Sequence, residues 1–284
     1  MSAEDACNAA AMGVHSTLPG AEVMALPMSD GGEGLVECVR KMMPTMPRSI
    51  MVVGPINKKV EATYAIATDG NTAYMEMAAA SGLTLVEESK RNPIIATTYG
   101  VGEMIADALR LGCKKIMMGI GGSATCDGGK GMVEALRDSG LMSLDVLKDI
   151  KFIVACDVDN PLYGKNGAAY IFAPQKGATE KEVEVLDNRL RNFAHETELL
   201  GLATPATALL PGTGAAGGLG YALLAYLKAE LKAGIEIMLD IANFDNTIMD
   251  ADIVVTGEGK SDHQTMMGKV AHGVMKRCRK ANKP

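Results

Sequence analysis

Residues 115–129 read KIMMGIGGSATCDGG, and this stretch decides the fold class of the chain. The apolar run from Lys115 to Ile120 predicts a buried strand, and a glycine-rich turn follows it without a break. A helix is predicted from about Lys130 to Arg137. Because the order of strand, glycine-rich turn and helix is typical of α/β proteins, we expect an α/β fold.

A predicted strand that ends on acidic residues recurs at three other places in the sequence, and at two of them a predicted helix follows. In each, the predicted strand runs into a turn that contains carboxylates. The two predicted helices run from about Leu35 to Met43 and from about Lys269 onward. The strands and their turns are Glu22 to Met28 with residues 29–34, Lys151 to Cys156 with residues 157–161, and Ile253 to Thr256 with residues 257–262.

Residues 49–77 follow a different pattern. Ser49 to Val53 is a predicted strand, and apolar residues then recur at every second position from Lys59 to Ala67. Asp69-Gly70 is a turn dipeptide, and Thr72 to Met77 is predicted to be the returning strand. An antiparallel hairpin inside an α/β chain indicates a second, differently built domain.

Several helices have recognisable starts. Residues 97–98 are predicted to cap one helix, and Thr179 with Glu182 forms a capping box ahead of another. The glycine-rich residues 211–220 open a long helix that we expect to end near Gly234. The basic residues of the last helix are expected to form a solvated end that complements the helix dipole; they are Lys276, Arg277, Arg279, Lys280 and Lys283.

The composition disfavours several classes of function. The chain has 284 residues, and 28 Lys or Arg against 34 Asp or Glu give a formal net charge of −6. An acidic chain with no basic run before its last helix is unlike a nucleic-acid-binding or membrane-surface protein. No apolar run approaches the ~20 residues of a transmembrane helix, and the first residues do not resemble a signal sequence. We therefore expect a soluble, cytoplasmic protein.

The six cysteines lie far apart in the sequence, with no CxxC pair and no spacing typical of a zinc site. We expect them to be reduced thiols. Cys126 and Cys156 stand next to acidic motifs, where a reactive thiol is conceivable, but a small buried side chain is the more common role of a free cysteine.

Four predicted strand ends combine glycine-rich backbone with carboxylates. In open α/β sheets the carboxyl ends of the strands line the ligand crevice, so we expect these segments to converge. Glycine turns ahead of helices suit phosphate oxygens, and nearby carboxylates can hold Mg²⁺ or accept a proton from a hydroxyl. The combination indicates phosphoryl transfer from a nucleotide. The carboxylates are Asp30 and Glu33, Asp127, Asp157 and Asp159, and Glu258 and Asp262.

Other interpretations of these residues stay open. A glycine-rich turn is more often simple turn chemistry than a ligand site, and close helix packing explains residues 214–220 equally well. Asp30 and Asp157 can cap a helix or a turn, and Asp127 can cap the helix after it. The chain contains no Walker P-loop, and no dinucleotide-binding glycine pattern follows a strand. Three basic residues can pair with an anion, although a solvated side chain is more common: Arg91, Lys176 and Lys260.

The sequence resembles the type I glycerate kinases of bacteria. The matching blocks occur in family order over nearly the whole chain, so they are more specific together than any single motif. They include LPMSDGGEG at residues 26–34, GIGGSATCDGG at residues 119–129, ACDVDNPL at residues 155–162 and TGEG at residues 256–259.

The resemblance implies ATP-dependent phosphorylation of D-glycerate with Mg²⁺, most often to 2-phosphoglycerate. It implies D-glycerate and ATP as the partners, with neither nucleic acid nor a membrane. It also implies two α/β domains with the active site in the cleft between them. The first is a discontinuous Rossmann-like domain of residues 1–54 and 250–284, and the second is an inserted mixed α/β domain of residues 55–249.

The resemblance also suggests roles for individual residues. Asp157 is the candidate base for the glycerate hydroxyl, and Asp30 is the second candidate catalytic group. Asp30 and Asp159 are the candidate metal ligands. The expected phosphate or nucleotide site consists of Gly121, Gly122, Ser123, Thr125 and Asp127, and the expected substrate site consists of Glu33, Arg91, Glu258 and Asp262.

The chain also departs from the family pattern. Family members begin with a strand and an Asp-Ser-Phe-Lys-Gly-type segment, have a longer stretch at the position of residues 136–147, and continue beyond the position of Pro284. We therefore expect a shortened version of a larger protein. Two alternative functions stay open, a non-catalytic remnant that binds a hydroxy acid or a nucleotide and a kinase of another small hydroxy acid.

Overall fold

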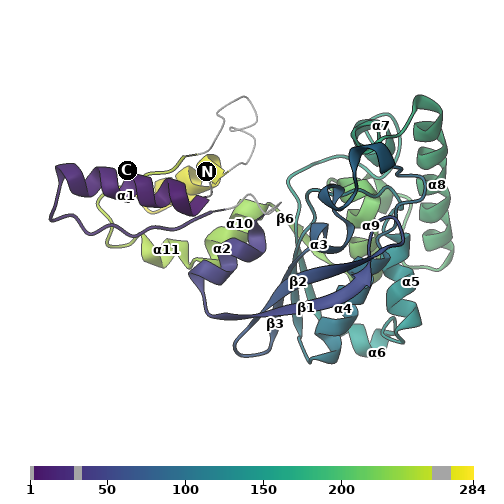
Figure 1. Cartoon of the computed structure of the whole chain (residues 1–284), viewed down its shortest axis with the longest axis horizontal. Helices are drawn as coiled ribbons and strands as arrows, with labels where there is room; N and C mark the ends of the chain where they lie inside the picture. The colour runs from purple at the N-terminus through teal and green to yellow at the C-terminus, as the bar shows by residue number, and fades with distance from the viewer. Residues whose placement is uncertain (1–2, 29–33, 258–269) are drawn as a thin grey trace.

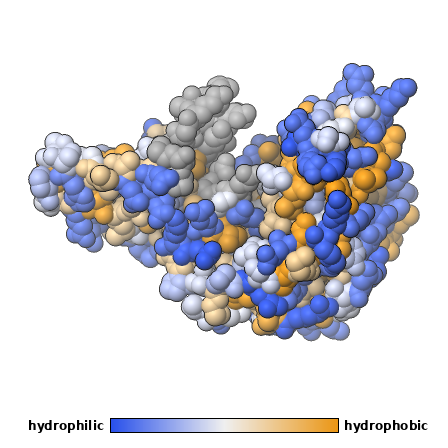
Figure 2. All heavy atoms as spheres, viewed as in Figure 1, coloured by the Kyte–Doolittle hydropathy of each residue, from blue (hydrophilic) through white to orange (hydrophobic). Residues whose placement is uncertain are grey.

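The computed structural model describes residues 3–28, 34–257 and 270–284, which form two lobes (Figure 1). The larger lobe holds the sheet. The smaller lobe is helical and brings both ends of the chain together (Figure 1). This arrangement confirms the predicted α/β class with two domains, one of them discontinuous. Figure 2 shows hydrophilic and hydrophobic residues interspersed over the visible face of the larger lobe.

The sheet of the larger lobe has six strands in the order β1-β2-β3-β4-β5-β6. The first three strands are antiparallel, which confirms the predicted hairpin, and the last four run parallel to one another. The hairpin therefore extends the parallel sheet. The strands are β1 (Thr45–Val53), β2 (Lys59–Ala67), β3 (Thr72–Glu76), β4 (Lys115–Gly119), β5 (Lys151–Ala155) and β6 (Glu230–Lys232).

β1 begins earlier than predicted and is an edge strand. It pairs with β2 over its whole length, from Thr45 opposite Ala67 to Val53 opposite Lys59. Pro47 is tolerated inside β1 because one side of an edge strand needs no ladder hydrogen bonds. The predicted domain boundaries at residues 54 and 250 stay a prediction.

Besides the strands, the described residues form twelve α-helices and four short 3-10 segments. Thr179 and Glu182 form the predicted capping box: the Thr179 N–H donates to Glu182 Oε2 at 2.7 Å, and the Glu182 N–H donates to Thr179 Oγ1 at 3.4 Å. The helices are α1 (Ala3–Thr17), α2 (Leu35–Met42), α3 (Ala78–Ser81), α4 (Tyr99–Arg110), α5 (Lys130–Asp138), α6 (Leu144–Leu147), α7 (Ala168–Phe172), α8 (Glu180–Leu199), α9 (Ala215–Leu227), α10 (Gly234–Ile241), α11 (Phe244–Thr247) and α12 (Val270–Lys280), and the 3-10 segments are η1 (Leu83–Leu85), η2 (Glu88–Lys90), η3 (Pro174–Lys176) and η4 (Thr207–Leu209).

The longest of these helices is α8, with 20 residues. It is anchored to the loop before α7 through Asp187, whose Oδ1 accepts a hydrogen bond from the Gly164 N–H at 2.7 Å. Arg191 donates to the other oxygen of Asp187 at 2.9 Å, and its guanidinium lies 4.4 Å from the centre of the Tyr163 ring. These contacts fix the position of α7 and of the η3 segment that follows it.

Helices cover both faces of the sheet, as the alternation of its buried side chains requires. On one face, strand residues such as Tyr64 and Met118 pack in the main hydrophobic core with α4, α5 and α9. On the other face, Met117 and Ile153 pack against α2 and α10. Since α10 also packs against α11 and α12, it links the sheet to the smaller lobe.

Three sequence predictions about secondary structure are wrong. Glu22 to Met28 and Ile253 to Thr256 are not strands, because neither segment has a strand to pair with among the described residues. The long helix expected to end near Gly234 instead ends at Leu227, where Lys228 adopts a left-handed conformation with φ of 53°. The residues after it form β6, which adds a parallel strand beside β5.

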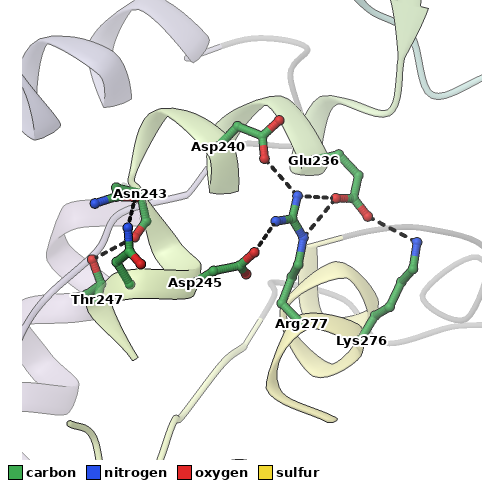
Figure 3. Close-up of polar contacts among 8 residues, drawn as sticks. Glu236, Asp240, Asn243, Asp245, Thr247, Lys276 and Arg277 are labelled. Carbon is green, nitrogen blue, oxygen red and sulfur yellow. Dashed lines mark hydrogen bonds and ion pairs between the residues drawn. The ribbon is translucent and has the colours of Figure 1, made fainter. Parts of the chain in front are cut away.

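The predicted solvated end of the last helix is wrong at Arg277, which joins three carboxylates of the smaller lobe (Figure 3). Its guanidinium donates to Glu236 at 2.6 Å, to Asp240 at 2.8 Å and to Asp245 at 2.8 Å. The Arg277 side chain is only 18% exposed. The cluster joins α12 to α10 and α11. The sequence alone does not show that Arg277 lies next to these carboxylates.

All six cysteines are free, as predicted. None of the helices in the described ranges is both long enough and apolar enough to cross a membrane. The prediction that residues 97–98 cap α4 is confirmed for Thr97, whose Oγ1 accepts a hydrogen bond from the Tyr99 N–H at 3.1 Å, but it is wrong for Thr98. Its hydroxyl donates instead to Asp127, which belongs to the site described below.

An ion pair between β1 and α4 makes stability depend on pH. Asp107 Oδ2 accepts from Arg48 Nε at 2.9 Å and from the Tyr64 hydroxyl at 2.7 Å, and Asp107 Oδ1 accepts from Arg48 Nη2 at 2.9 Å. The hydrogen bonds from Arg48 hold the pKa of Asp107 below its ordinary value of 3.8. A carboxylate with a lowered pKa stabilises the fold above the unfolded-state pKa, and this contribution is lost as the pH falls through the folded-state pKa.

We expect Asp107→Asn to lower the free energy of unfolding by about 1–3 kcal/mol at neutral pH, because it removes charge-assisted hydrogen bonds. Chemical denaturation from pH 7 down to pH 3 checks this: the difference between wild type and variant should shrink below about pH 4. Asp145→Asn is the control, since the Asp145 side chain is 95% exposed. A difference that stays constant with pH would contradict the assigned role of the carboxylate charge.

Candidate active site

A cavity of about 330 Å³ lies at the carboxyl ends of β4 and β5. These strands are parallel neighbours, and their last residues, Gly119 and Ala155, are paired in register. The segments that follow them therefore leave the sheet side by side, as predicted for the carboxyl ends of an α/β sheet. Polar groups of the lining come from Gly121, Gly122, Ser123, Asp157, Gln175 and Lys176.

The turn after β4 provides backbone donors. The Leu83 N–H donates to the Gly122 carbonyl at 2.8 Å, which holds the turn against η1. Gly122 has φ of 70°, a left-handed conformation that glycine adopts without steric strain. Within the described parts of the chain, the N–H groups of Gly121, Gly122 and Ser123 have no acceptor. Consecutive free N–H groups suit the oxygens of a phosphate or a carboxylate.

Lys176 lies at the end of η3 and is buried, with 2% of its surface exposed. Its Nζ donates to Ser123 Oγ and to the Thr125 carbonyl, both at 2.7 Å. Burial lowers the pKa of Lys176 to about 8. Gly177, with φ of 97°, ends η3 and turns the chain away. The lysine therefore places a positive charge against the wall of the cavity.

Asp127 lies behind this turn and organises two helices. Its carboxylate accepts hydrogen bonds from the Thr98 N–H and hydroxyl, both at 2.8 Å, and from the N–H groups of Gly129 at 3.1 Å and Gly131 at 3.2 Å. Burial raises its pKa, and these hydrogen bonds oppose that effect. Asp127 thus caps the start of α5, one of its two predicted roles, and does not line the cavity.

The segment after β5 supplies a carboxylate to the cavity. Asp157 is exposed and lines it, and its Oδ1 accepts a hydrogen bond from the Gly234 N–H at the start of α10, at 2.9 Å. Cys156 also lines the cavity, and burial raises the pKa of its thiol, which favours the unreactive role predicted for it. Asp159 is exposed and is not part of the lining.

The start of α9 closes another side of the cavity through Ala215 and Ala216. Ala216, Gly217 and Gly218 all have positive φ, so the chain makes a tight non-helical turn before the regular helix. A Cβ atom on Gly217 would lie 2.0 Å from the Thr125 carbonyl oxygen. The close packing predicted as one explanation of this glycine-rich segment is therefore present.

Comparison with known proteins identifies the family to which the chain belongs. The family model described as the Glycerate kinase family matches residues 1–142 and 141–284, which together span the chain. This chain belongs to the glycerate kinase family. The two matched segments meet inside residues 136–147, the stretch expected from the sequence to be shorter than in other family members.

Named relatives in the glycerate kinase family are similar over the whole chain. A glycerate kinase of Bacillus subtilis (strain 168) is 44% identical over 308 residues, an alignment that covers 100% of this chain and 80% of the relative. A glycerate 2-kinase of Escherichia coli (strain K12) shows the same identity and coverage. These relatives identify the chain as a kinase.

A solved structure is similar in fold as well as in sequence. It is the crystal structure of a protein assigned as glycerate kinase 2 from Salmonella typhimurium LT2, with 40% sequence identity. The superposition has a TM-score of 0.88 and covers 100% of this chain and 82% of that chain. The fold described above is therefore the fold of a glycerate kinase family member.

The structure brings part of the predicted site together. Gly121, Gly122, Ser123 and Asp157 line one cavity, whereas Thr125 and Asp127 lie behind its wall. Arg91 is half-buried and does not line the cavity, and its buried Nε has no partner among the described residues. Four further predicted residues lie outside the described residues: Asp30, Glu33, Glu258 and Asp262.

The burial of Lys176 is the main feature that the sequence did not establish. A lone lysine was expected to be solvated more often than paired, and the structure overturns that expectation. The only local signal was its place between Pro174 and Gly177, two residues that force the chain to turn. That signal predicts a turn but does not predict which side of the turn is buried.

Proposed function

We propose that this chain transfers the γ-phosphoryl group of ATP to D-glycerate, giving 2-phosphoglycerate, with Mg²⁺ as the cofactor. One observation carries the proposal: in a glycerate kinase family member, anion-binding donors and a carboxylate line the same cavity at the ends of two parallel strands. The Escherichia coli relative named a glycerate 2-kinase supports the position of phosphorylation.

The turn of Gly121, Gly122 and Ser123 is the proposed site for phosphoryl oxygens. Its free N–H groups and the Ser123 hydroxyl are donors, and such donors stabilise the charge that spreads over the transferring group. We propose that Thr125 and Asp127 support this turn from the side that faces away from the cavity. The Thr125 carbonyl holds Lys176, and Asp127 fixes the start of the helix that follows the turn.

Asp157 is the proposed base. Its hydrogen bond from the Gly234 N–H orients the carboxylate at the edge of the cavity. In the proposed step, Asp157 takes the proton of a glycerate hydroxyl as that oxygen bonds to the γ-phosphorus, and the bond between phosphorus and the ADP oxygen breaks. The base makes the hydroxyl a better nucleophile without forming a covalent intermediate.

Asp159 and Asp30 are the proposed Mg²⁺ ligands. In phosphoryl transfer Mg²⁺ is ordinarily held by one or two carboxylates together with phosphate oxygens and water, and it neutralises the phosphate charge. The exposed carboxylate of Asp159 fits that donor set, and no group of three or more candidate ligand side chains occurs within the described ranges. Substrate contacts are proposed for Glu33, Arg91, Glu258 and Asp262.

A coupled assay of ADP formation with ATP, Mg²⁺ and D-glycerate tests the proposal, with the product position read by ³¹P NMR. We expect glycerate-dependent ADP formation and a phosphate on the 2-oxygen. L-Glycerate, lactate and glycolate serve as competing acids, and a preference for one of them would assign a different substrate. A folded chain that binds ATP but produces no ADP with any acid would contradict the proposal.

A further inference from the structure

The buried ammonium of Lys176 makes no direct ion pair among the described residues, and Asp127, the carboxylate that acts on it from a distance, is already held by four hydrogen bonds. Its two hydrogen-bond acceptors, the Ser123 hydroxyl and the Thr125 carbonyl, are neutral. Lysine is seldom fully buried without a partner, because removing the charge from water is costly. Since Lys176 lines the cavity, an anion bound there can supply the negative charge that no described carboxylate places in direct contact with the ammonium.

The hydrogen bond from Lys176 also determines what Ser123 can do. A serine oxygen that accepts from an ammonium keeps its own proton available for another acceptor. Ser123 lines the cavity beside the free N–H groups of Gly121 and Gly122, so an anionic oxygen bound there is the natural acceptor. The positive charge next to the hydroxyl strengthens such a hydrogen bond.

We propose that Lys176 is a positioning residue of the active site: it holds Ser123 so that the serine hydroxyl donates to an anionic oxygen of a substrate, whose charge balances the buried ammonium. This inference rests on the proposed function for the identity of the substrates. The anionic oxygen belongs either to the glycerate carboxylate or to a phosphate of ATP, and both share the chemistry that the site recognises.

Calorimetric binding and steady-state kinetics on Ser123→Ala, Lys176→Met and the double variant test the proposal. Each single change should raise the dissociation constant and the KM of one substrate by about 10- to 100-fold. An effect on D-glycerate assigns the carboxylate, and an effect on ATP assigns the phosphate. Because Lys176 acts through Ser123, the double variant should lose little more than Lys176→Met alone.

Lys165→Met is the matched control, because Lys165 is an exposed lysine outside the cavity lining. Ser123→Ala keeps the proposal testable if Lys176→Met does not fold, since Lys176 retains the Thr125 carbonyl as an acceptor. Unchanged binding of both substrates in Ser123→Ala, or fully additive losses in the double variant, would overturn the proposal. Absence of turnover in wild type contradicts the proposed function instead, and the binding measurements still decide the role of Lys176.

The pH dependence provides a readout that a merely structural lysine would not change. Burial lowers the pKa of Lys176 to about 8, so binding of the affected substrate should weaken as the pH rises from about 7 to about 9. The other titratable groups around it are Cys126, Asp127 and Asp157, and burial raises the pKa of Cys126 to about 11. Lys176→Met should remove this dependence, and an unchanged dependence would count against the proposal.

Discussion

Replacing Asp157 by Asn should lower kcat for glycerate phosphorylation by about 100- to 10,000-fold, the range expected when a general base is lost. The amide cannot accept the hydroxyl proton, yet its oxygen can still accept the hydrogen bond from the Gly234 N–H. We therefore expect the thermal unfolding temperature to stay close to that of wild type. The coupled assay with saturating ATP and D-glycerate measures the effect.

The matched control for this change is Asp149→Asn. Asp149 is exposed and precedes β5, whereas Asp157 follows the same strand at its opposite end. The control should keep wild-type activity because it leaves the carboxyl end of the strand untouched. If Asp157→Asn also keeps more than about a tenth of wild-type kcat, Asp157 is a structural cap of α10 and the base lies elsewhere.

Gly217→Ala should be strongly destabilising, by about 3 kcal/mol or more, because positive φ and a steric clash act together. Gly217 has φ of 67°, and a Cβ atom there would lie 2.0 Å from the Thr125 carbonyl oxygen. That oxygen also accepts a hydrogen bond from Lys176, so the clash displaces the wall of the cavity. Denaturant unfolding and the KM of each substrate should both change.

Gly201→Ala separates the two causes. Gly201 has nearly the same φ, 70°, but nothing lies within 4 Å of the position of its Cβ atom. This control therefore carries only the conformational cost, about 1 kcal/mol, and should leave both KM values unchanged. Equal destabilisation by the two substitutions would show that the close approach of α9 to the turn after β4 does not contribute to stability.

The sequence was most informative where local pattern and tertiary role agree. Lys115 to Ile120, its glycine turn and the helix after it were predicted nearly as they occur, because a buried strand and a glycine-rich turn each leave a short-range signature. The alternation from Lys59 to Ala67 likewise identified β2, since period-two burial is a property of the strand itself.

Predictions failed where a distant partner decides the outcome. Glu22 to Met28 has the composition of a strand, but a strand exists only beside another strand. Residues 230–232 resemble the preceding helix in composition, yet they form a strand because the edge of β5 is available to pair with them. The sequence also placed Asp157 and the turn of residues 121–123 at neighbouring strand ends. The burial of Lys176 instead depends on where α7 and α8 place η3.

A crystal structure of this chain with D-glycerate and a non-hydrolysable ATP analogue tests most directly that the cavity at the ends of β4 and β5 is the active site. We predict an anionic substrate oxygen about 3 Å from Ser123 Oγ and from the Gly122 nitrogen, with a glycerate hydroxyl at hydrogen-bond distance from Asp157. Both ligands bound away from this cavity, with Lys176 and Ser123 contacting neither, would contradict the account.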